Sequence, residues 1–569
     1  MNRVHVKPLA VLGVVLFVLL LWSYPLLTTQ LAAQWDVKVH LRWADQFYAA
    51  VHEGWWLPRW AHASLNGLGD PTFLYYQPLF YYLTSIFAML GAPLPYWLLL
   101  GGVTIYVLSG LVLYRYFLRC YPPYRSALGV MFVLASPPVF FLATQMSAFP
   151  WVLSFPFSIL FVAESMRDRP RVARLAILIA LVCLSHILSA MMTLLCTGLG
   201  RLIFAFPDRK TIRAHLAWGT GIALGLGLTA FYLYPALTQL SLITPGGWTN
   251  GTGYDWRRNF AFPVITFFQY GLKWAGPQWT LAVLTPILAV LTLLPLREMR
   301  LSPMAITARR LAIVALVAAA LGSELAYPLY AVFTPLHKLQ FPYRFLFLGS
   351  LLASVAFVIQ LNEGAWSRWS KTVRTAAVLL FMIYFGQLAI LEWKLLSGGT
   401  RLPDREEVMT GRFGQPEYLP AVARPAWKHY ADSGKLEGEC RRLEIECSEM
   451  RHRTHDFSVT ITTTKRISVR LPMFAFPAWQ ATVDGQVQSY AVDEGTGMIQ
   501  MDLPAGRHLV ALRWVPLPAE TVGKWISVVA FCLLIGVLLI TRRPRYAAAR
   551  QSDEEPQQER NGAHVQLDT

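Results

Sequence analysis

The sequence predicts a polytopic α-helical membrane protein that carries a small antiparallel β-sandwich outside the cytoplasm. Of the 569 residues, 55% are hydrophobic and only 15% are charged, whereas soluble domains are about one quarter charged. Apolar runs of about 17 to 25 residues recur along the chain, and each is long enough to span a bilayer. Near the C-terminus these runs give way to short alternating stretches that are typical of strands. The mean hydropathy of +0.41 agrees with the membrane class.

The formal net charge of +17 would suggest nucleic-acid binding in a soluble protein. Here the Lys and Arg residues lie mostly in short loops between apolar runs, where they set the orientation of the spans. We therefore expect no nucleic-acid partner. Sequence motifs of phosphate-loop ATPases, α/β-hydrolases and zinc proteases are absent from the chain.

We expect about 11 to 13 membrane spans, because each long apolar run is counted as one crossing. The candidate spans are 9–27, 76–91, 96–118, 126–143, 149–165, 172–205, 214–238, 279–296, 311–330, 345–361, 374–395 and 522–541. From residue 210 onward, basic loops alternate consistently with these runs and mark the cytoplasmic ends. This alternation places three segments outside, namely 241–278, 331–344 and 396–520.

The N-terminal half does not follow simple alternation. Segments 119–125 and 167–174 both have the basic composition of cytoplasmic loops. Either one apolar segment in this half does not cross, or 172–205 is a hairpin. That segment is long enough for one tilted helix or for two short helices that meet at Ser185-His186.

The first apolar run, 9–27, follows Arg3 and Lys7, so a cleaved signal peptide is an alternative to a membrane helix. We favour an uncleaved helix, because the run is long, lacks an Ala-x-Ala cleavage pattern and is followed by many more apolar runs.

The domain boundaries follow from these patterns. Strand-like runs rich in Val, Ile and Thr are punctuated by Asp484-Gly485 and Ala505-Gly506, as expected for turns. We expect a transmembrane domain at 1–395 with a first external loop at 28–75, a β-sandwich at 396–520, a C-terminal transmembrane helix at 521–541 and a disordered cytoplasmic tail at 542–569.

Two of the six cysteines lie in the polar region near the sandwich. Cys440 and Cys447 could form a disulfide if this region is extracytoplasmic, or they could be two free thiols. The other four lie in or beside apolar segments and are expected to behave as small apolar residues.

The stretch after the first span is rich in charged and aromatic residues. Asp36 and His40 are four residues apart, so they share one face of a helix. Apolar residues recur at helical spacing after Val37, which predicts a helix lying in the membrane interface with its aromatic side down. Asp36 could be only the N-cap of this helix. Alternatively, its carboxylate is held at the membrane surface to accept a proton or bind a cation.

The order of motifs resembles the GT-C superfamily of membrane glycosyltransferases. An outward Asp36 is followed by Pro58-Arg59-Trp60 and by the entry Tyr75-Tyr76-Gln77-Pro78 into the next span. Within that superfamily, the chain is similar to the bacterial membrane proteins labelled "6-pyruvoyl-tetrahydropterin synthase-related", with YfhO-like proteins as relatives. The further motifs that carry the resemblance are Leu184-Ser185-His186, Leu339-Gln340-Phe341-Pro342-Tyr343-Arg344, Glu417-Tyr418-Leu419-Pro420, Phe476-Pro477-Ala478-Trp479, Val483-Asp484-Gly485 and Leu503-Pro504-Ala505-Gly506-Arg507-His508.

The resemblance implies a GT-C-like fold in a bacterial inner membrane. It also implies a polyprenyl-phosphate sugar donor, an envelope acceptor on the outer side and contact with membrane lipid. It assigns Asp36 as the catalytic base. Many members carry two acids in this motif, whereas Trp35-Asp36-Val37-Lys38 has a single one. This departure leaves open whether a divalent cation, Mg²⁺ or Mn²⁺, takes part, and whether catalysis is retained.

Basic side chains are the candidate ligands of the donor phosphate, since Arg and Lys bind phosphate well. The alternative is ordinary snorkelling of long basic side chains at the interface. Glu324 is a further acid near the end of its span, whereas Asp255 is expected to be a solvated loop acid. His186 is expected to be a core histidine bonded to a neighbouring helix. The full set of candidate substrate-binding residues is His40, Arg59, His337, Lys338, Arg344 and Glu324.

The predicted function is inverting transfer of a sugar from a polyprenyl-phosphate donor to an envelope glycan, lipid or protein. The rival hypothesis is a non-catalytic factor that binds or flips lipid-linked glycans on the same scaffold. A transporter would show repeated halves, and the sequence shows no such repeat. The sandwich could bind carbohydrate through Trp427, Trp479 or Trp514, or it could be a structural cap.

Overall fold

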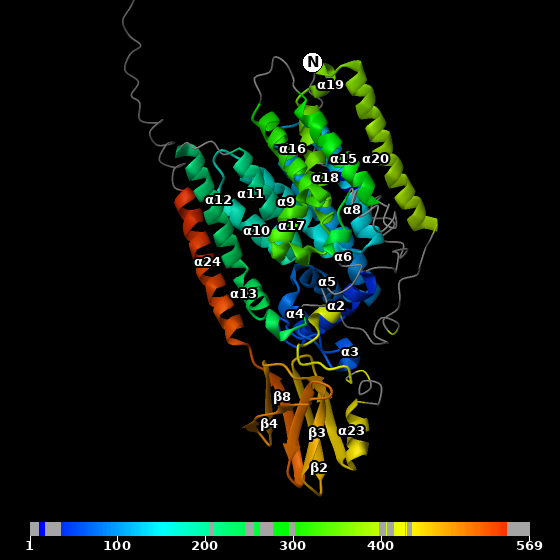
Figure 1. Ribbon diagram of the computed structural model, residues 1–569, viewed down its shortest axis with the longest axis vertical. Coiled ribbons are helices and arrows are strands. Elements are labelled where there is room, and N and C mark those ends of the chain that lie inside the picture. The colour runs from blue at the N-terminus through cyan, green and yellow to red at the C-terminus, as the bar shows by residue number, and fades with distance from the viewer. Residues whose placement is uncertain are drawn as a thin grey trace, which may run out of the picture.

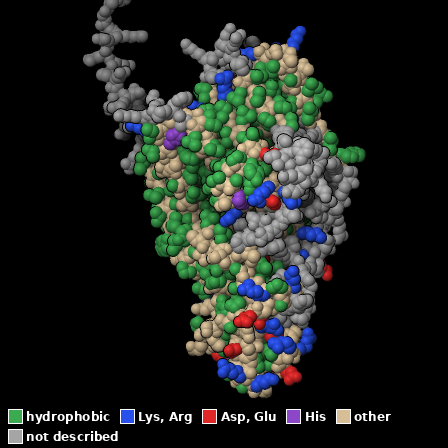
Figure 2. Space-filling model, viewed as in Figure 1, with side chains coloured by type: hydrophobic (Ala, Val, Ile, Leu, Met, Phe, Trp, Pro, Cys, Tyr) green, Lys and Arg blue, Asp and Glu red, His purple; other side chains and the backbone are tan. Residues whose placement is uncertain are grey.

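The chain folds into a helical body with a sheet domain attached at one end (Figure 1). This computed structural model describes residues 11–16, 36–204, 209–244, 255–261, 277–294, 302–397, 406, 415–426, 428 and 435–542. Most of the predicted first span, the polar tail and Trp427 lie outside the described residues. Hydrophobic side chains cover the helical body, whereas charged side chains gather over the sheet domain (Figure 2).

The described chain contains four helices that are long and apolar enough to cross a membrane, and a fifth candidate if one bent pair counts as a span. The four are α6 (Leu94–Phe117), α16 (Pro303–Gly322), α18 (Arg344–Asn362) and α24 (Pro518–Arg542), and the bent pair is α12 (Arg209–Leu228) with α13 (Ala230–Thr238), which meet at 82°. By length alone this is fewer than the predicted 11 to 13 spans, because several apolar runs form helices of only 10–17 residues.

The shorter helices overlap the predicted spans, although α7 and α15 begin two or three residues earlier than predicted. The bounds are α5 (Leu79–Met89), α7 (Pro123–Leu134), α9 (Phe149–Ser165), α10 (Val172–Ser185), α11 (Ile187–Ile203) and α15 (Pro277–Leu293), while α20 (Lys371–Ser397) is longer. At about 1.5 Å per residue, α5 is only about 16 Å long. The prediction that 76–91 forms a full span is therefore wrong, because the polar turn before Leu79 shortens its helix.

Segment 172–205 is a helical hairpin, one of the two arrangements that the sequence left open. Glu164, at the end of α9, accepts hydrogen bonds from the Arg171 backbone N–H (2.9 Å) and from Arg174 (2.9 Å). The neighbouring Ser165 carbonyl accepts a hydrogen bond from Arg201. The start of α10 and the end of α11 therefore lie at the same end of α9, and the chain reverses at His186.

The basic loops gather at the end of the helical body that lies away from the sheet domain. Arg310 pairs with Asp168 at 2.8 Å, and Glu363 accepts hydrogen bonds from Tyr121 and Ser302. This grouping agrees with the predicted cytoplasmic loops, since positive residues favour that side.

Helix α18 forms the centre of the helical body. Its residues from Phe345 to Gln360 are buried on all faces, as expected for a helix that is apolar all round. It packs closely against α16, where Gly349 faces the Ala315 carbonyl. The start of α18, Arg344, is thereby fixed at the end of the body that faces the sheet domain.

The sheet domain consists of two antiparallel sheets, as the alternating pattern predicted. The strand orders are β1-β2-β8-β4-β5 and β3-β7-β6. Asp484 and Gly485 both have positive φ in the turn between β4 and β5, which confirms the predicted Asp-Gly hairpin turn. The bounds are β1 (Glu446–His452), β2 (Asp456–Thr463), β3 (Ile467–Phe474), β4 (Trp479–Val483), β5 (Gln486–Gln488), β6 (Ala491–Val492), β7 (Met498–Leu503) and β8 (Gly506–Trp514).

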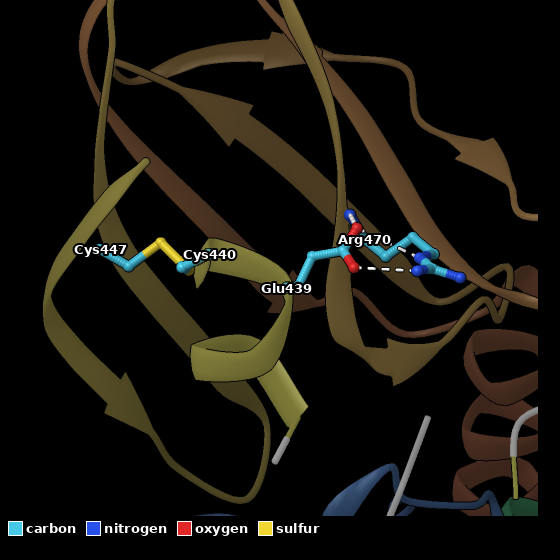
Figure 3. The surroundings of a disulfide bond; sticks show 4 residues. All are labelled: Glu439, Cys440, Cys447 and Arg470. Atoms are coloured by element: carbon cyan, nitrogen blue, oxygen red, sulfur yellow. Dashed lines mark hydrogen bonds and ion pairs between the residues drawn. A yellow bond between two sulfur atoms is a disulfide. The ribbon is translucent and has the colours of Figure 1, made fainter. Parts of the chain in front are cut away.

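A disulfide joins Cys440 of α23 (Lys435–Leu443) to Cys447 of β1 (Figure 3). The structure thus decides between the two states that the sequence left open. Beside it, burial alone would raise the pKa of Glu439, but hydrogen bonds from Arg442 and Arg470 outweigh burial and hold the pKa at about 2. Glu439 therefore stabilises the folded domain above its unfolded pKa of about 4.5, and this contribution is lost as pH falls toward 2.

The loop that carries Arg59 docks against the start of α24 through a buried ion pair. The Arg59 Nε atom lies 2.7 Å from Glu520 at the start of α24, and both side chains are at least 95% buried. The Arg59 guanidinium also donates to the Phe231 carbonyl of α13 (2.9 Å), and its backbone N–H donates to His455 Nε2 (3.1 Å). The Arg59 guanidinium is thus buried in contacts that hold three elements together, and substrate binding by Arg59 stays a prediction.

Aromatic residues seal the same interface. Trp60 contacts Phe476, Trp479 and Trp514, with ring centroids 5.5–5.8 Å apart. Gly69, with φ of +75°, lies so close to the Trp60 ring that a Cβ atom would overlap it. Trp479 and Trp514 are buried, so the suggestion that they bind carbohydrate is wrong.

We predict that Arg59→Met destabilises the protein strongly, since it leaves Glu520 buried without its charge partner, at a cost of about 3–5 kcal/mol. Arg513→Met is the matched control, because Arg513 is exposed and lies 4.0 Å from Asp456. Thermal unfolding in detergent should show a large fall in Tm for the first variant and little change for the second. Adding Glu520→Leu to Arg59→Met should recover part of the loss. Equal Tm values for the two single variants would contradict this role.

Candidate functional site

Asp36 stands at the N-cap position of α2 (Val37–His52), but its side chain makes no capping hydrogen bond. Its backbone N–H donates to the Met146 carbonyl (3.2 Å), and its own carbonyl accepts from the His40 N–H (2.8 Å). The interpretation of Asp36 as a simple N-cap therefore does not account for the carboxylate. Asp36 is half-buried, so the side chain is neither solvated like a loop acid nor used by its helix.

Helix α2 is present where the sequence predicted it, but its burial differs from the prediction. An interfacial helix was expected to bury one face, whereas Arg42, Asp45 and Gln46 are buried together with the aromatic side. The reason is that α5 and α6 cover one side and the loop before α5 covers another. The helix is about 24 Å long, with Asp36 at one end and Glu53, which accepts two hydrogen bonds from Thr454 of the sheet domain, at the other.

Arg344 is the first residue of α18 and is held by a strained turn. Gln340 has φ of +61° and ψ of −41°, and the Phe341 N–H donates to the Leu339 carbonyl at 2.5 Å, which makes a γ-turn of a rare kind. The Leu339 carbonyl then accepts a second hydrogen bond from Arg344 at 3.0 Å. Non-glycine residues in such conformations persist only where their surroundings enforce them.

A second strained segment lies on the other side of Asp36. The π-helix η1 (Phe141–Gln145) is followed by Met146 and by Ser147, which has φ of +55°. The Met146 carbonyl is the acceptor for the Asp36 N–H. Single π turns occur frequently at functional sites. Both irregular segments therefore meet at the charged pair of Asp36 and Arg344.

Glu417 joins this pair from the linker that leads into the sheet domain. It lies in the short helix η7 (Pro416–Tyr418), and Asp36 is close enough to raise its pKa further, after burial as the main cause. The linker is held in place by backbone hydrogen bonds from Thr244 to Leu419 and from Ala421 to Leu242, both 2.9 Å.

Aromatic rings surround the two carboxylates. Tyr418 lies 6.3 Å from Tyr76 and 5.9 Å from Trp43, between ring centroids. Burial raises the pKa of Tyr76, and the charges of Asp36 and Glu417 add to this effect. Tyr76 therefore keeps its proton at neutral pH and can act as a hydrogen-bond donor to a bound ligand.

The electrostatics of Asp36 suit proton transfer near neutral pH. Burial raises the pKa of its carboxyl and the Arg344 guanidinium lowers it, so that the resulting pKa is about 6. The carboxylate is then mostly ionised at pH 7, while its proton affinity is higher than that of a solvated aspartate. A general base works best when its pKa lies near the operating pH.

Trp151 of α9 links Arg344 to the turn of the α10–α11 hairpin. The Arg344 Cζ atom lies 5.6 Å from the Trp151 ring centroid, and His186 stacks on the same ring at 5.4 Å with an interplanar angle of 15°. His186 was expected to be a core histidine bonded to a neighbouring helix, whereas the residue as a whole is half-buried and lies within electrostatic reach of Arg344.

His40 lies one helical turn from Asp36, as its spacing predicted, but it faces the core. Its ring is buried, Nδ1 lies 2.7 Å from the Tyr81 hydroxyl, and burial lowers its pKa to about 3. The ring packs among Trp43, Tyr76 and Phe80, and substrate binding by His40 stays a prediction.

His337, Lys338 and Glu324 belong to a second group, centred on Trp256. His337 stacks on Trp256 at 4.9 Å, and its Nε2 lies 2.7 Å from the Tyr330 carbonyl. Lys338 is exposed beside it, and Glu324 follows the bridge between Ser323 and Ala261. Asp255 caps the short helix η4 (Trp256–Arg258) by accepting from the Arg257 N–H. Of the predicted basic ligands, Arg344 is the one whose charge acts on Asp36.

The described side chains around Asp36 include no ready-made set of metal ligands. Among the described residues, no three His, Cys, Asp or Glu side chains come together as metal ligands. Arg344 already supplies a positive charge next to Asp36. We therefore derive no catalytic step through a Mg²⁺ or Mn²⁺ ion.

Glu417 is the main site residue that the sequence did not assign. The motif Glu417-Tyr418-Leu419-Pro420 was noted as part of the family resemblance, but nothing local connects it with Asp36. The signal that could have found it is an acid flanked by Pro416 and Tyr418, read together with the missing second acid next to Asp36.

Comparisons with known proteins give weak matches. No protein-family model matches the chain, and no curated protein matches it. Among solved structures, two of arabinofuranosyltransferase AftD from Mycobacteria, one of them a mutant, match with a TM-score of 0.40 and 17% sequence identity. The match covers 74% of this chain but only 29% and 30% of those chains. A TM-score of 0.40 lies below the level at which shared topology can be asserted, so the site residues carry the assignment of function.

We predict that the carboxyl of Asp36 titrates near pH 6 and that Arg344 sets this value. Dicyclohexylcarbodiimide modifies protonated carboxyls, so mass spectrometry should show labelling of Asp36 that falls as pH rises through about 6. Arg344→Gln removes the charge that lowers the pKa, so the midpoint should move to higher pH. Arg257→Gln, a charge loss in another loop, should leave it unchanged. A wild-type midpoint near 4, or no shift in Arg344→Gln, would contradict this assignment.

Proposed function

We propose that this protein is a multi-pass membrane glycosyltransferase of GT-C type, with its sheet domain outside the cytoplasm. The observation that carries the proposal is a carboxylate, Asp36, that caps no helix and is held beside Arg344 with its pKa raised to about 6. The order of sequence motifs supports the same family. The apolar helices and the basic loops at the opposite end support membrane insertion with the site on the outer side.

The proposed reaction is inverting transfer of a sugar from a polyprenyl-phosphate donor to a hydroxyl of an envelope glycan, lipid or protein. The acceptor oxygen attacks the anomeric carbon, and Asp36 takes the proton of the hydroxyl. The bond between the anomeric carbon and the phosphate oxygen breaks, and the phosphate leaves with the bonding electron pair. The protein supplies a base on one side of the sugar and positive charge on the other.

Arg344 is the proposed partner of the leaving phosphate. A guanidinium offers a planar set of donors that matches phosphate oxygens. Its position at the first residue of α18 is fixed by the γ-turn at Gln340 and by the Leu339 carbonyl. Little reorganisation would be needed when charge develops on the phosphate, which is the condition for strong electrostatic stabilisation.

Glu417 provides the second acid that the first loop lacks. Two carboxylates close together cannot both ionise easily, and the charge of Asp36 adds to burial in raising the pKa of Glu417. We further propose that Tyr76, which Trp43 and Tyr418 pack behind, offers the face against which a sugar ring packs, since aromatic faces suit the apolar side of a sugar.

The direct test is transfer by purified protein from a panel of radiolabelled hexosyl and pentosyl polyprenyl phosphates. Asp36→Asn keeps the size of the side chain but removes the base, so transfer should fall by about 10²–10⁴-fold. Asp255→Asn is the matched control, because Asp255 is an acid that caps η4 in another loop, and transfer should remain near the wild-type level.

Two outcomes would contradict the proposal in different ways. Transfer that survives in Asp36→Asn would move the catalytic base elsewhere, with Glu417 and then Glu324 tested next. Absence of transfer from every donor, by protein that still binds polyprenyl phosphate, would favour the non-catalytic factor that binds or flips lipid-linked glycans.

A further inference from the structure

His186 forms the turn between α10 and α11 and is oriented by its own helix. Its backbone is extended, with φ of −161° and ψ of 108°, and it stands at the N-cap of α11. The Ser189 backbone N–H donates to His186 Nδ1 at 3.2 Å, and the Ser189 hydroxyl lies 2.8 Å from the same atom. Ser154 of α9 hydrogen-bonds to the Ser189 hydroxyl at 2.9 Å.

These contacts fix which ring nitrogen carries the proton. A backbone N–H can only donate, so Nδ1 must be the acceptor, and the neutral ring then carries its hydrogen on Nε2. Within the described part of the chain, Nε2 has no hydrogen-bond partner. The residue as a whole is half-buried. An oriented donor is thus left available at the turn of the hairpin.

The donor lies next to the charged pair of the site. His186 stacks on Trp151, whose ring also lies near the Arg344 guanidinium, and both Arg344 and His40 are within electrostatic reach of His186. A second full positive charge beside Arg344 would be costly in apolar surroundings. A neutral imidazole can add a hydrogen bond there without adding charge.

We propose that the Nε2–H group of His186 donates a hydrogen bond to a phosphate oxygen of the lipid donor bound at Arg344. This inference rests on the proposed function of the same site. A phosphate has more acceptor positions than one guanidinium can satisfy, so a second donor of fixed direction is useful. Ser189 and Ser154 are positioning residues, because they act on the ligand only through the orientation of His186.

The test is binding of decaprenyl phosphate, and of decaprenol as a lipid without phosphate, to purified full-length protein in nanodiscs. His186→Ala should weaken the binding of decaprenyl phosphate about 10-fold and leave the binding of decaprenol unchanged, since one charge-assisted hydrogen bond is lost. His186→Gln retains an N–H donor and should lose less. His215→Ala is the matched control, because His215 lies at the other end of the helical body, beside Arg201.

If His186→Ala weakened the binding of both lipids equally, His186 would have a packing role and the inference would be overturned. Unchanged binding of both lipids would also overturn the inference. Failure of wild-type protein to bind decaprenyl phosphate would overturn it as well. A His186 dependence of phosphate binding without any sugar transfer would support the inference while the proposed reaction fails. Sugar transfer by a protein whose phosphate binding does not depend on His186 would support the proposed reaction and overturn the inference about His186. Thermal unfolding checks that each variant is folded.

Discussion

The buried ion pair between Arg59 and Glu520 fixes the arrangement of the whole molecule. A charge that is removed from water must be paired, so the loop that carries Arg59 packs where Glu520 at the start of α24 meets it. Arg59 also binds the Phe231 carbonyl and His455. The first loop, the sheet domain, α13 and the last helix are therefore held as one unit, although they lie far apart in the sequence.

This unit positions the helix that follows Asp36 and the linker that carries Glu417. Helix α2 begins at Asp36 and ends where Glu53 binds Thr454 of the sheet domain, so it forms a rigid link between the two. The linker into the sheet domain passes the start of α2 and brings Glu417 near Asp36. Glu417 and Tyr418 belong to this linker, whereas the buried tryptophans of the sheet domain serve packing.

Local features were predictable from the sequence, whereas long-range partners were not. The helix after Asp36, the Asp-Gly turn and the antiparallel strands follow from spacing and turn chemistry, which act over a few residues. The hairpin at His186 was only one of the arrangements that the sequence left open. The positions of the Arg59 and His40 side chains depend on their partners Glu520 and Tyr81, which no local sequence pattern identifies. Glu417 was missed for the same reason. The short α5 shows that an apolar run alone does not fix the length of a helix.

The central claim is that Arg344 and Asp36 face the phosphate and the reacting sugar of one lipid-linked substrate. The most direct measurement is a cryo-electron microscopy structure of the protein in nanodiscs with decaprenyl phosphate bound. The account predicts phosphate density within about 3 Å of the Arg344 guanidinium, on the side of the Asp36 carboxylate. Phosphate bound instead at His337 and Lys338, with the Arg344 region empty, would contradict it.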